Sequence, residues 1–224
     1  MAIFQRPVRA GRAISPKFLA RSFFASWIAI GILGWALAPI KSAQAGKAKF
    51  NKVLDIGDQA PDWTDLPGVD GKKHNLDEYR DAKAVVVLFT CNRCPVSKQY
   101  AERLAAFVKK YEKQVQVVAI SVSLHGADRL NQMAVRAAEK PFPYPYLHDE
   151  SQFTGRTYGA TATPQFFLLD GKRRIAYMGA FDDNFADAEK VEKQYLIDAV
   201  EAVLAGKEPK VKESLPRGCA IEYE

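Results

Sequence analysis

The sequence predicts an α/β fold in which helices cover both faces of a central mixed β-sheet. Two continuous β-branched apolar runs, at 84–89 and 115–122, are typical of strands buried on both faces. Segments with helical periodicity follow both runs, and alternating strands and helices favour a parallel arrangement. Asp170-Gly171 separates two further apolar runs and predicts a β-hairpin, which makes the sheet mixed.

The other elements follow from turn residues and apolar spacing. Pro95 suits the first position of a helix, Asp128 is a plausible helix cap, and Gly206 marks a helix end. The elements expected after the first strand are a helix over 95–111, a strand over 115–122, a helix over 128–139, a strand over 146–148, a short helix over 151–158, hairpin strands over 165–169 and 174–178, and a last helix from about 191 to 204.

Composition and charge exclude several classes of protein. The chain has 224 residues, of which 48% are hydrophobic and 26% charged, as in ordinary globular proteins. The net charge of +6 comes from residues 1–45, which hold six basic residues and no acidic one. Residues 46–224 carry 26 basic and 26 acidic residues. This neutral part offers no electrostatic footprint for nucleic acid.

Residues 1–45 have the pattern of an export signal. A positive region precedes an apolar run over 22–38, and Ala43-Gln44-Ala45 then fits signal peptidase, with cleavage expected before Gly46. The alternative is an uncleaved N-terminal membrane anchor. Either reading places residues 46–224, expected to form a single domain, outside the cytoplasm, in the periplasm or an equivalent compartment.

Two of the three cysteines form the strongest chemical signal. Cys91-x-x-Cys94 lies between a buried strand and a helix start, where the partial positive charge of the helix N-terminus favours thiolate over thiol. Arg93 between them adds a full positive charge and is a candidate for tuning their pKa values. A thiolate there attacks disulfides, and the neighbouring thiol resolves the mixed disulfide. A zinc site would need a second Cys/His pair, and none lies at ligand spacing, so no metal or other cofactor is expected.

Four segments spread along nearly the whole of 46–224 carry a family resemblance. They are Gly57-x-x-Ala60-Pro61-Asp62, the cysteine loop over 89–95, the loop over 158–164 that ends in Thr163-Pro164, and Gly218-Cys219-Ala220-Ile221. Together they resemble the thioredoxin-like superfamily, and most closely its exported redoxin branch, which includes alkyl hydroperoxide reductase and thiol-specific antioxidant (AhpC/TSA) proteins.

The resemblance implies a thioredoxin-like fold and a particular site. Thr163-Pro164 should have a cis peptide bond and lie against Cys91 and Cys94, exposing the Thr163 backbone for pairing with an extended substrate. The implied activity is that of an oxidoreductase acting on thiol and disulfide groups. Its implied partners are protein or small-molecule disulfides and thiols, an upstream thiol reductant and, for the antioxidant branch, peroxides.

The chain departs from thioredoxins where proton transfer is concerned. Their buried carboxylate six residues before the first cysteine is replaced by Val85, so proton handling must come from elsewhere. The order of attack is also open. The spacing from the strand to the loop, and the Pro95 that follows, favour Cys94 as the attacking cysteine. The Thr or Ser that peroxiredoxins need three residues earlier is replaced by Cys91, which argues against a peroxidase.

Cys219 and the histidines leave further alternatives. Cys219, five residues from the C-terminus, is a candidate resolving thiol or, equally, a thiol with a packing role. The leading hypothesis is an exported thiol–disulfide oxidoreductase, followed by a thiol peroxidase. A third is a thioredoxin-fold copper-binding protein, in which His125 or His148 would complete a site with the two thiolates.

Overall fold

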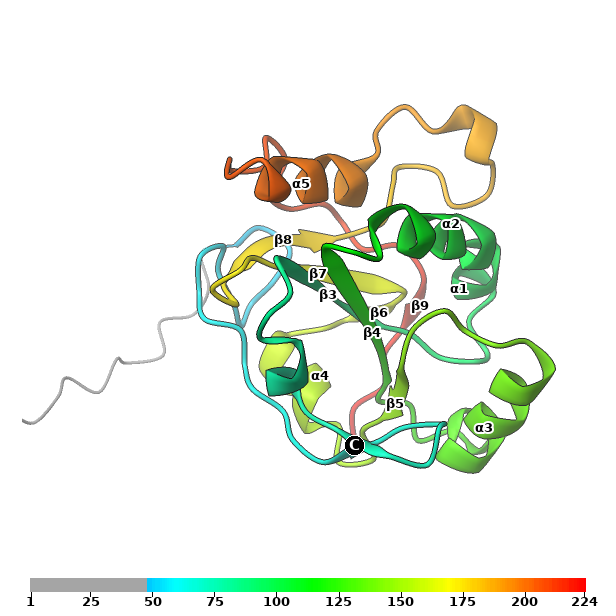
Figure 1. Ribbon diagram of the computed structural model, residues 1–224. Coiled ribbons are helices and arrows are strands. Elements are labelled where there is room, and N and C mark those ends of the chain that lie inside the picture. Colours follow the sequence, from blue (N-terminus) through cyan, green and yellow to red (C-terminus); the bar gives the residue numbers. More distant parts are fainter. Residues whose placement is uncertain (1–47) are drawn as a thin grey trace, which may run out of the picture. The chain divides into compact units, whose positions relative to one another are not determined.

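The computed structural model describes residues 48–224 (Figure 1). The predicted signal peptide or membrane anchor at 1–45 lies outside the described residues. Within 48–224, no helix is long and apolar enough to cross a membrane.

A five-stranded mixed sheet forms the centre of the described residues. Its strands stand in the order β5-β4-β3-β7-β8. Strands β3, β4 and β5 run parallel, whereas β7 is antiparallel to both β3 and β8, so the predicted α/β fold class is confirmed. The bounds are β3 (Ala84–Phe89), β4 (Val115–Ser121), β5 (Tyr146–His148), β7 (Gln165–Leu169) and β8 (Ile175–Gly179).

The central strand β3 separates two hydrophobic cores. Every residue of β3 is buried, and successive side chains point to opposite faces of the sheet. Val85, Val87 and Phe89 join one core, and the intervening side chains join the other. A strand buried on both faces holds the backbone at its carboxyl end firmly, and the cysteine loop begins there.

Helices cover both faces of this sheet, as the sequence predicts. The face that packs against Val86 carries α1 (Pro95–Gln99), α2 (Ala101–Tyr111), α3 (Leu130–Glu139) and α5 (Tyr195–Leu204). The opposite face carries α4 (Phe153–Tyr158) and the N-terminal part of the described chain (Figure 1). The latter part contains β1 (Leu66–Pro67), β2 (Lys73–His74) and the 3₁₀ turn η1 (Leu76–Tyr79).

Three predicted helix starts are wrong, each for a local reason. Helix α3 begins at Leu130 because Asp128 belongs to a separate 3₁₀ turn, η2 (Gly126–Asp128), and is not a cap. Helix α4 begins at Phe153, after a left-handed residue, Gln152. Helix α5 begins at Tyr195, because the four preceding residues follow another 3₁₀ turn, η3 (Ala188–Lys190), and two of their backbone N–H groups bind the Asp183 carboxylate.

One of two small two-stranded sheets within residues 48–224, formed by β6 (Ala162–Thr163) and β9 (Cys219–Ala220), joins the C-terminal end to the middle of the chain. Strand β9 is antiparallel to β6, with Cys219 opposite Thr163. The two strands lie side by side in Figure 1, where the C-terminal segment is red. This pairing brings the third cysteine to the edge that carries Thr163.

Candidate active site

The cysteine loop joins the buried strand β3 to helix α1. Thr90 still donates its backbone N–H to Ile120 of β4 (3.0 Å), so the loop starts from a fixed point. Cys94 is the N-cap residue of α1, and Pro95 occupies the first turn, as the sequence predicts. Cys94 is fully buried, whereas Cys91 is half-buried.

The Cys94 sulfur lies among hydrogen-bond donors. Its Sγ accepts from the backbone N–H of Ser97 (3.4 Å), and as a thiol it donates to the carbonyl of Thr163 (2.9 Å). Burial alone would raise the pKa of Cys94, but hydrogen bonds from the side chain and backbone of Ser97, the backbone of Cys219 and the side chain of Thr163 lower that pKa to about 7. Cys94 is therefore the thiol that most readily becomes a thiolate.

The Cys91 sulfur has the opposite electrostatic surroundings. Burial and the negative charge of Asp128 raise the pKa of Cys91, and a hydrogen bond from Thr163 offsets this only in part. The Cys91 Sγ lies 3.7 Å from the Thr163 hydroxyl. Cys91 is thus the accessible sulfur but not the acidic one.

The Thr163-Pro164 segment lies against both sulfurs, through the Thr163 hydroxyl at Cys91 and the Thr163 carbonyl at Cys94. The Thr163-Pro164 peptide bond is cis, the isomer that the resemblance implies. Two residues separated from the cysteine loop by some seventy positions are thus brought to the site.

Cys219 completes a group of three sulfurs. The Thr163 hydroxyl contacts the Cys219 carbonyl at 3.4 Å, and the backbone of Cys219 donates to Cys94. Burial and the neighbouring Cys94 raise the pKa of the half-buried Cys219 to about 11, although the charge of Arg93 acts in the opposite direction. All three cysteines are free thiols in this structure.

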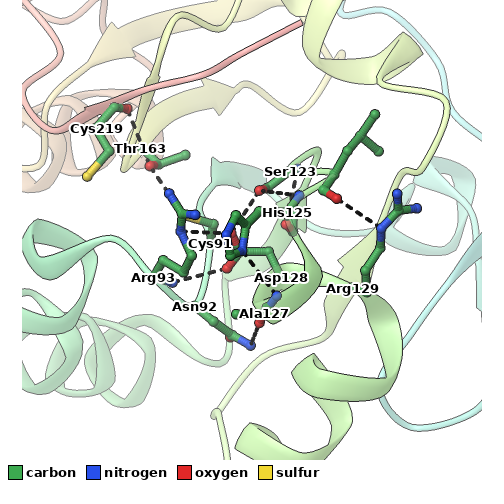
Figure 2. A network of polar contacts seen from close by, with 12 residues as sticks. Cys91, Asn92, Arg93, Ser123, His125, Ala127, Asp128, Arg129, Thr163 and Cys219 are labelled. Carbon is green, nitrogen blue, oxygen red and sulfur yellow. Dashed lines mark hydrogen bonds and ion pairs between the residues drawn. The ribbon is translucent and has the colours of Figure 1, made fainter. Parts of the chain in front are cut away.

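Asp128 is a site residue that the sequence analysis missed. Its side chain is 1% exposed, accepts hydrogen bonds from the backbone of Arg93 (3.0 Å) and the hydroxyl of Ser123 (2.8 Å), and lies beside Cys91 in Figure 2. The carboxylate therefore holds the loop between the two cysteines. The only signal in the sequence was an acidic residue after the second strand, which equally suits a helix cap.

The Arg93 side chain pairs with Asp128 and lines the groove that contains the sulfurs. It is about half exposed and places Nε 3.8 Å from Asp128. The neighbouring Asn92 donates to the carbonyl of Ala127 (3.1 Å), so two consecutive loop residues are tied to the η2 turn (Figure 2).

One groove of about 490 Å³ contains all three sulfurs. Asp128, Thr163 and the last residues of the chain line it with Cys91, Cys94 and Cys219. His125 also lines the groove, and its Nδ1 accepts from the backbone of Ala127 (3.2 Å). The ring of His148 contacts the carbonyl of Ser123 instead (3.2 Å). Among residues 48–224, no cluster of three or more His, Cys, Asp or Glu is arranged to hold a metal ion.

This combination of sheet, cysteine loop and proline-bearing loop defines the class of thioredoxin-like thiol-redox proteins, because it sets a stabilised thiolate beside an accessible thiol. Within that class, the model of the AhpC/TSA family matches residues 56–178, and the chain belongs to this family. The protein is accordingly an oxidoreductase that acts on thiols.

Solved structures of other proteins have a similar fold. A hypothetical protein of Sinorhizobium meliloti 1021 shares 34% identity over 78% of this chain and 97% of its own, with a TM-score of 0.71. An uncharacterized conserved protein of Geobacillus kaustophilus shares 31% sequence identity over 75% of this chain and 92% of its own, with a TM-score of 0.70. A Chlorobium tepidum protein, provisionally named thiol:disulfide interchange protein DsbE, shares 27% sequence identity over 56% of this chain and 84% of its own, with a TM-score of 0.50. No curated protein sequence matches the chain.

Proposed function

We propose that the protein is a thiol–disulfide oxidoreductase whose Cys91 and Cys94 cycle between a dithiol and a disulfide. The observation that carries this proposal is the contrast between an accessible thiol, Cys91, and a buried thiol, Cys94, whose pKa is lowered to about 7. The resemblance to a protein named as a thiol:disulfide interchange protein supports the same reaction class.

The proposed reaction assigns one role to each sulfur. The Cys91 thiolate attacks a substrate disulfide RSSR, forming the Cys91–SR mixed disulfide and releasing RS⁻. The Cys94 thiolate then attacks the Cys91 sulfur, forming the Cys91–Cys94 disulfide and releasing the second RS⁻. The pair has lost two electrons to the substrate, and the two thiol protons pass to the released thiolates or to water. An upstream thiol reductant returns the pair to the dithiol.

The lowered pKa of Cys94 also favours the return step. A reductant thiolate attacks the accessible Cys91 sulfur of the disulfide, and Cys94 leaves. A leaving thiol with a low pKa leaves faster, so the hydrogen bonds that stabilise the Cys94 thiolate speed this step.

Trapping of the mixed disulfide tests the proposal. In the Cys94→Ser variant, a small chromogenic disulfide should leave a stable adduct of one equivalent on Cys91, located by peptide mass spectrometry. Cys91→Ser should form no comparable adduct, and Cys219→Ser, the matched control, should turn over as the native chain does. A double variant lacking both Cys91 and Cys94 that still reduces disulfides would refute the proposal.

A thiol peroxidase is the second candidate, and a specific observation favours it. Cys94 combines a pKa of about 7 with a place at a helix N-cap before Pro95, in a chain of the AhpC/TSA family. In that reaction Cys94 would be oxidised to the sulfenate by a hydroperoxide, and Cys91 or Cys219 would condense with it and release water. The Cys91→Ser variant separates the candidates, because a peroxidase resolved by Cys219 keeps consuming peroxide while disulfide exchange is lost.

We also propose that the protein acts outside the cytoplasm, either released or tethered at its N-terminus. The support is the basic and apolar pattern of residues 1–45 with its Ala43-Gln44-Ala45 site. Expression of the full chain followed by cell fractionation and N-terminal sequencing tests this. A released form that begins at Gly46 is expected, and an intact chain in the cytoplasm would contradict it.

A further inference from the structure

The edge of strand β6 beside the sulfurs is already occupied by the chain itself. Strand β9 pairs with β6 in antiparallel register, Cys219 opposite Thr163 and Ala220 opposite Ala162. Beyond the pair, the backbone N–H of Ile221 donates to the carbonyl of Thr161 (3.0 Å). An extended polypeptide that approached Cys91 by adding a strand to this edge would need the same backbone groups.

The C-terminal segment that carries β9, residues 218–224, is also anchored outside the β6–β9 pair. The buried side chain of Gln152 donates to the carbonyls of Val122 (2.9 Å) and Glu222 (2.8 Å), so it ties the segment to the end of β4. The Tyr223 hydroxyl donates to the carbonyl of Ala160 (2.8 Å), and the Arg156 guanidinium lies over the Tyr223 ring at 4.8 Å. With these anchors β9 is part of the folded structure.

Gly218 allows the close approach of this segment. A Cβ added at Gly218 would collide with the carbonyl oxygen of Thr163, so no other residue lets the backbone lie this close to β6. The Cys94 thiolate depends on the approach as well, because the backbone of Cys219 is one of its hydrogen-bond donors. The approach of residues 218–219 to β6 therefore both covers the edge of β6 and stabilises the Cys94 thiolate.

We propose that the 218–224 segment takes the place of a polypeptide substrate, so that the site reacts with low-molecular-mass disulfides and thiols in preference to extended polypeptides. This inference rests on the proposed function and adds the substrate class. Cys91 stays accessible with β9 in place, because it lines both the groove of about 490 Å³ and a smaller pocket with Lys98, Arg136 and Tyr144. A small disulfide can reach the sulfur from these openings without pairing with β6.

Matched substrates test the substrate class directly. N-acetylcysteine amide and an unstructured peptide with one central cysteine are each converted to the same mixed disulfide with thionitrobenzoate. Both probes contain the same reacting bond and release the same chromophore, so only the flanking backbone differs. The ratio of kcat/KM for the small probe to kcat/KM for the peptide is measured for the native chain and its variants.

Two variants should lower this ratio by opening the edge. Gly218→Ala displaces the segment by one methyl group, and a chain that ends at Arg217 removes the segment altogether. We expect the native chain to favour the small probe by about tenfold or more, equivalent to about 1.4 kcal/mol, and both variants to lose most of that preference. Gly171→Ala, in the distant β7–β8 hairpin, and Cys219→Ser, which keeps the segment and its backbone N–H, should leave the ratio unchanged.

The outcomes separate this inference from the proposed function. Equal kcat/KM for both probes in the native chain, or an unchanged ratio in the truncated chain, would overturn the inference and leave the oxidoreductase activity standing. A native chain that reacts with neither probe would overturn the proposed function, and the inference with it. If Gly218→Ala does not fold, the ratio measured for the truncated chain, compared with that of Cys219→Ser, still tests the inference about substrate class.

Discussion

Cys91 and Cys94 lie three residues apart but occupy contrasting surroundings. Cys94 is buried at a helix N-cap among hydrogen-bond donors that lower its pKa to about 7. Cys91 is half-buried beside the buried carboxylate of Asp128, and burial and that charge raise its pKa. One sulfur is stabilised as a thiolate and the other is accessible to a partner.

The contrast teaches that a CxxC loop need not give one cysteine every property of a nucleophile. A mixed disulfide forms at the sulfur that a partner can reach, and it is resolved fastest by a neighbour that is already ionised.

Removing the buried thiolate should abolish turnover. Cys94→Ser leaves no neighbour to resolve the mixed disulfide on Cys91, so steady-state reduction of a small disulfide should fall by about a thousandfold or more. Stopped-flow release of a chromogenic thiol separates the first turnover, which should persist, from later ones. Turnover within tenfold of the native rate would show that another thiol, such as Cys219, resolves the adduct, and the division of roles would be wrong.

Removing a donor should make Cys94 less acidic. The Ser97 side chain and backbone both stabilise the Cys94 thiolate, and Ser97→Ala removes only the side-chain hydrogen bond. Because hydrogen bonds to the charged form lower a thiol pKa, this variant should raise the pKa of Cys94 above about 7. Less thiolate is then present at neutral pH, so alkylation of Cys94 should slow there by about threefold and recover at high pH.

The control for Ser97→Ala is Ser151→Ala, which removes a hydroxyl outside the site. Alkylation should be followed in chains that also carry Cys91→Ser and Cys219→Ser, so that Cys94 is the one remaining thiol. A pH profile that stays at the position of the parent chain would mean that the Ser97 hydroxyl does not set the pKa of Cys94.

Removing the negative charge beside Cys91 should narrow the difference between the cysteines. Asp128→Asn keeps one oxygen that can accept from the backbone N–H of Arg93, and its amide nitrogen can donate to the Ser123 hydroxyl, but it loses the charge that raises the pKa of Cys91. The pKa of Cys91 should therefore fall, and its alkylation at neutral pH should become severalfold faster. The control is Glu150→Gln, at an exposed acidic residue that pairs with Arg129. It should change neither the pKa of Cys91 nor the rate of its alkylation.

A merely structural role for Asp128 predicts a different result. Loss of loop anchoring would lower the thermal stability and the total activity without moving the pH midpoint of Cys91 alkylation. The midpoint, read in chains that lack Cys94 and Cys219, distinguishes the two roles.

The smallest effect is expected at Arg93. The guanidinium is about half exposed, pairs with Asp128 and partly offsets the rise in the pKa of Cys219. Arg93→Gln should therefore raise the pKa of Cys219 slightly and slow disulfide turnover by less than about threefold. A tenfold loss of Cys94 reactivity would contradict this expectation and support the role in tuning the cysteine pair that the sequence predicts for Arg93.

The sheet could be predicted from sequence because its signals are local. β3 is a run of six apolar residues buried on both faces, and the β7–β8 hairpin contains its own Asp170-Gly171 turn. Helix starts were harder to predict. Helix α4 begins directly after Gln152, which has a left-handed backbone conformation, and the Gln152 amide donates a hydrogen bond to the carbonyl of Glu222 in the C-terminal segment. That contact spans 70 residues of sequence and has no local pattern.

The candidate site likewise has features with a local sequence motif and features that depend on contacts between distant residues. The cysteine loop and Thr163-Pro164 were visible as motifs, but Asp128 was interpreted as a helix cap because nothing in the sequence shows that it meets Arg93, 35 residues earlier. The strand β9 has only two residues, between Gly218 and Ile221, so its pairing with β6 is what defines it. The relative acidity of Cys91 and Cys94 likewise depends on the donors and charges that folding brings to each.

Separate titration of the two thiols tests this division most directly. In a chain carrying Cys91→Ser and Cys219→Ser, the ultraviolet absorbance of the Cys94 thiolate should appear with a midpoint near pH 7. In a chain carrying Cys94→Ser and Cys219→Ser, the Cys91 thiolate should appear only above the ordinary pKa of a cysteine. A Cys91 midpoint below that of Cys94 would contradict the assignment of Cys94 as the stabilised thiolate.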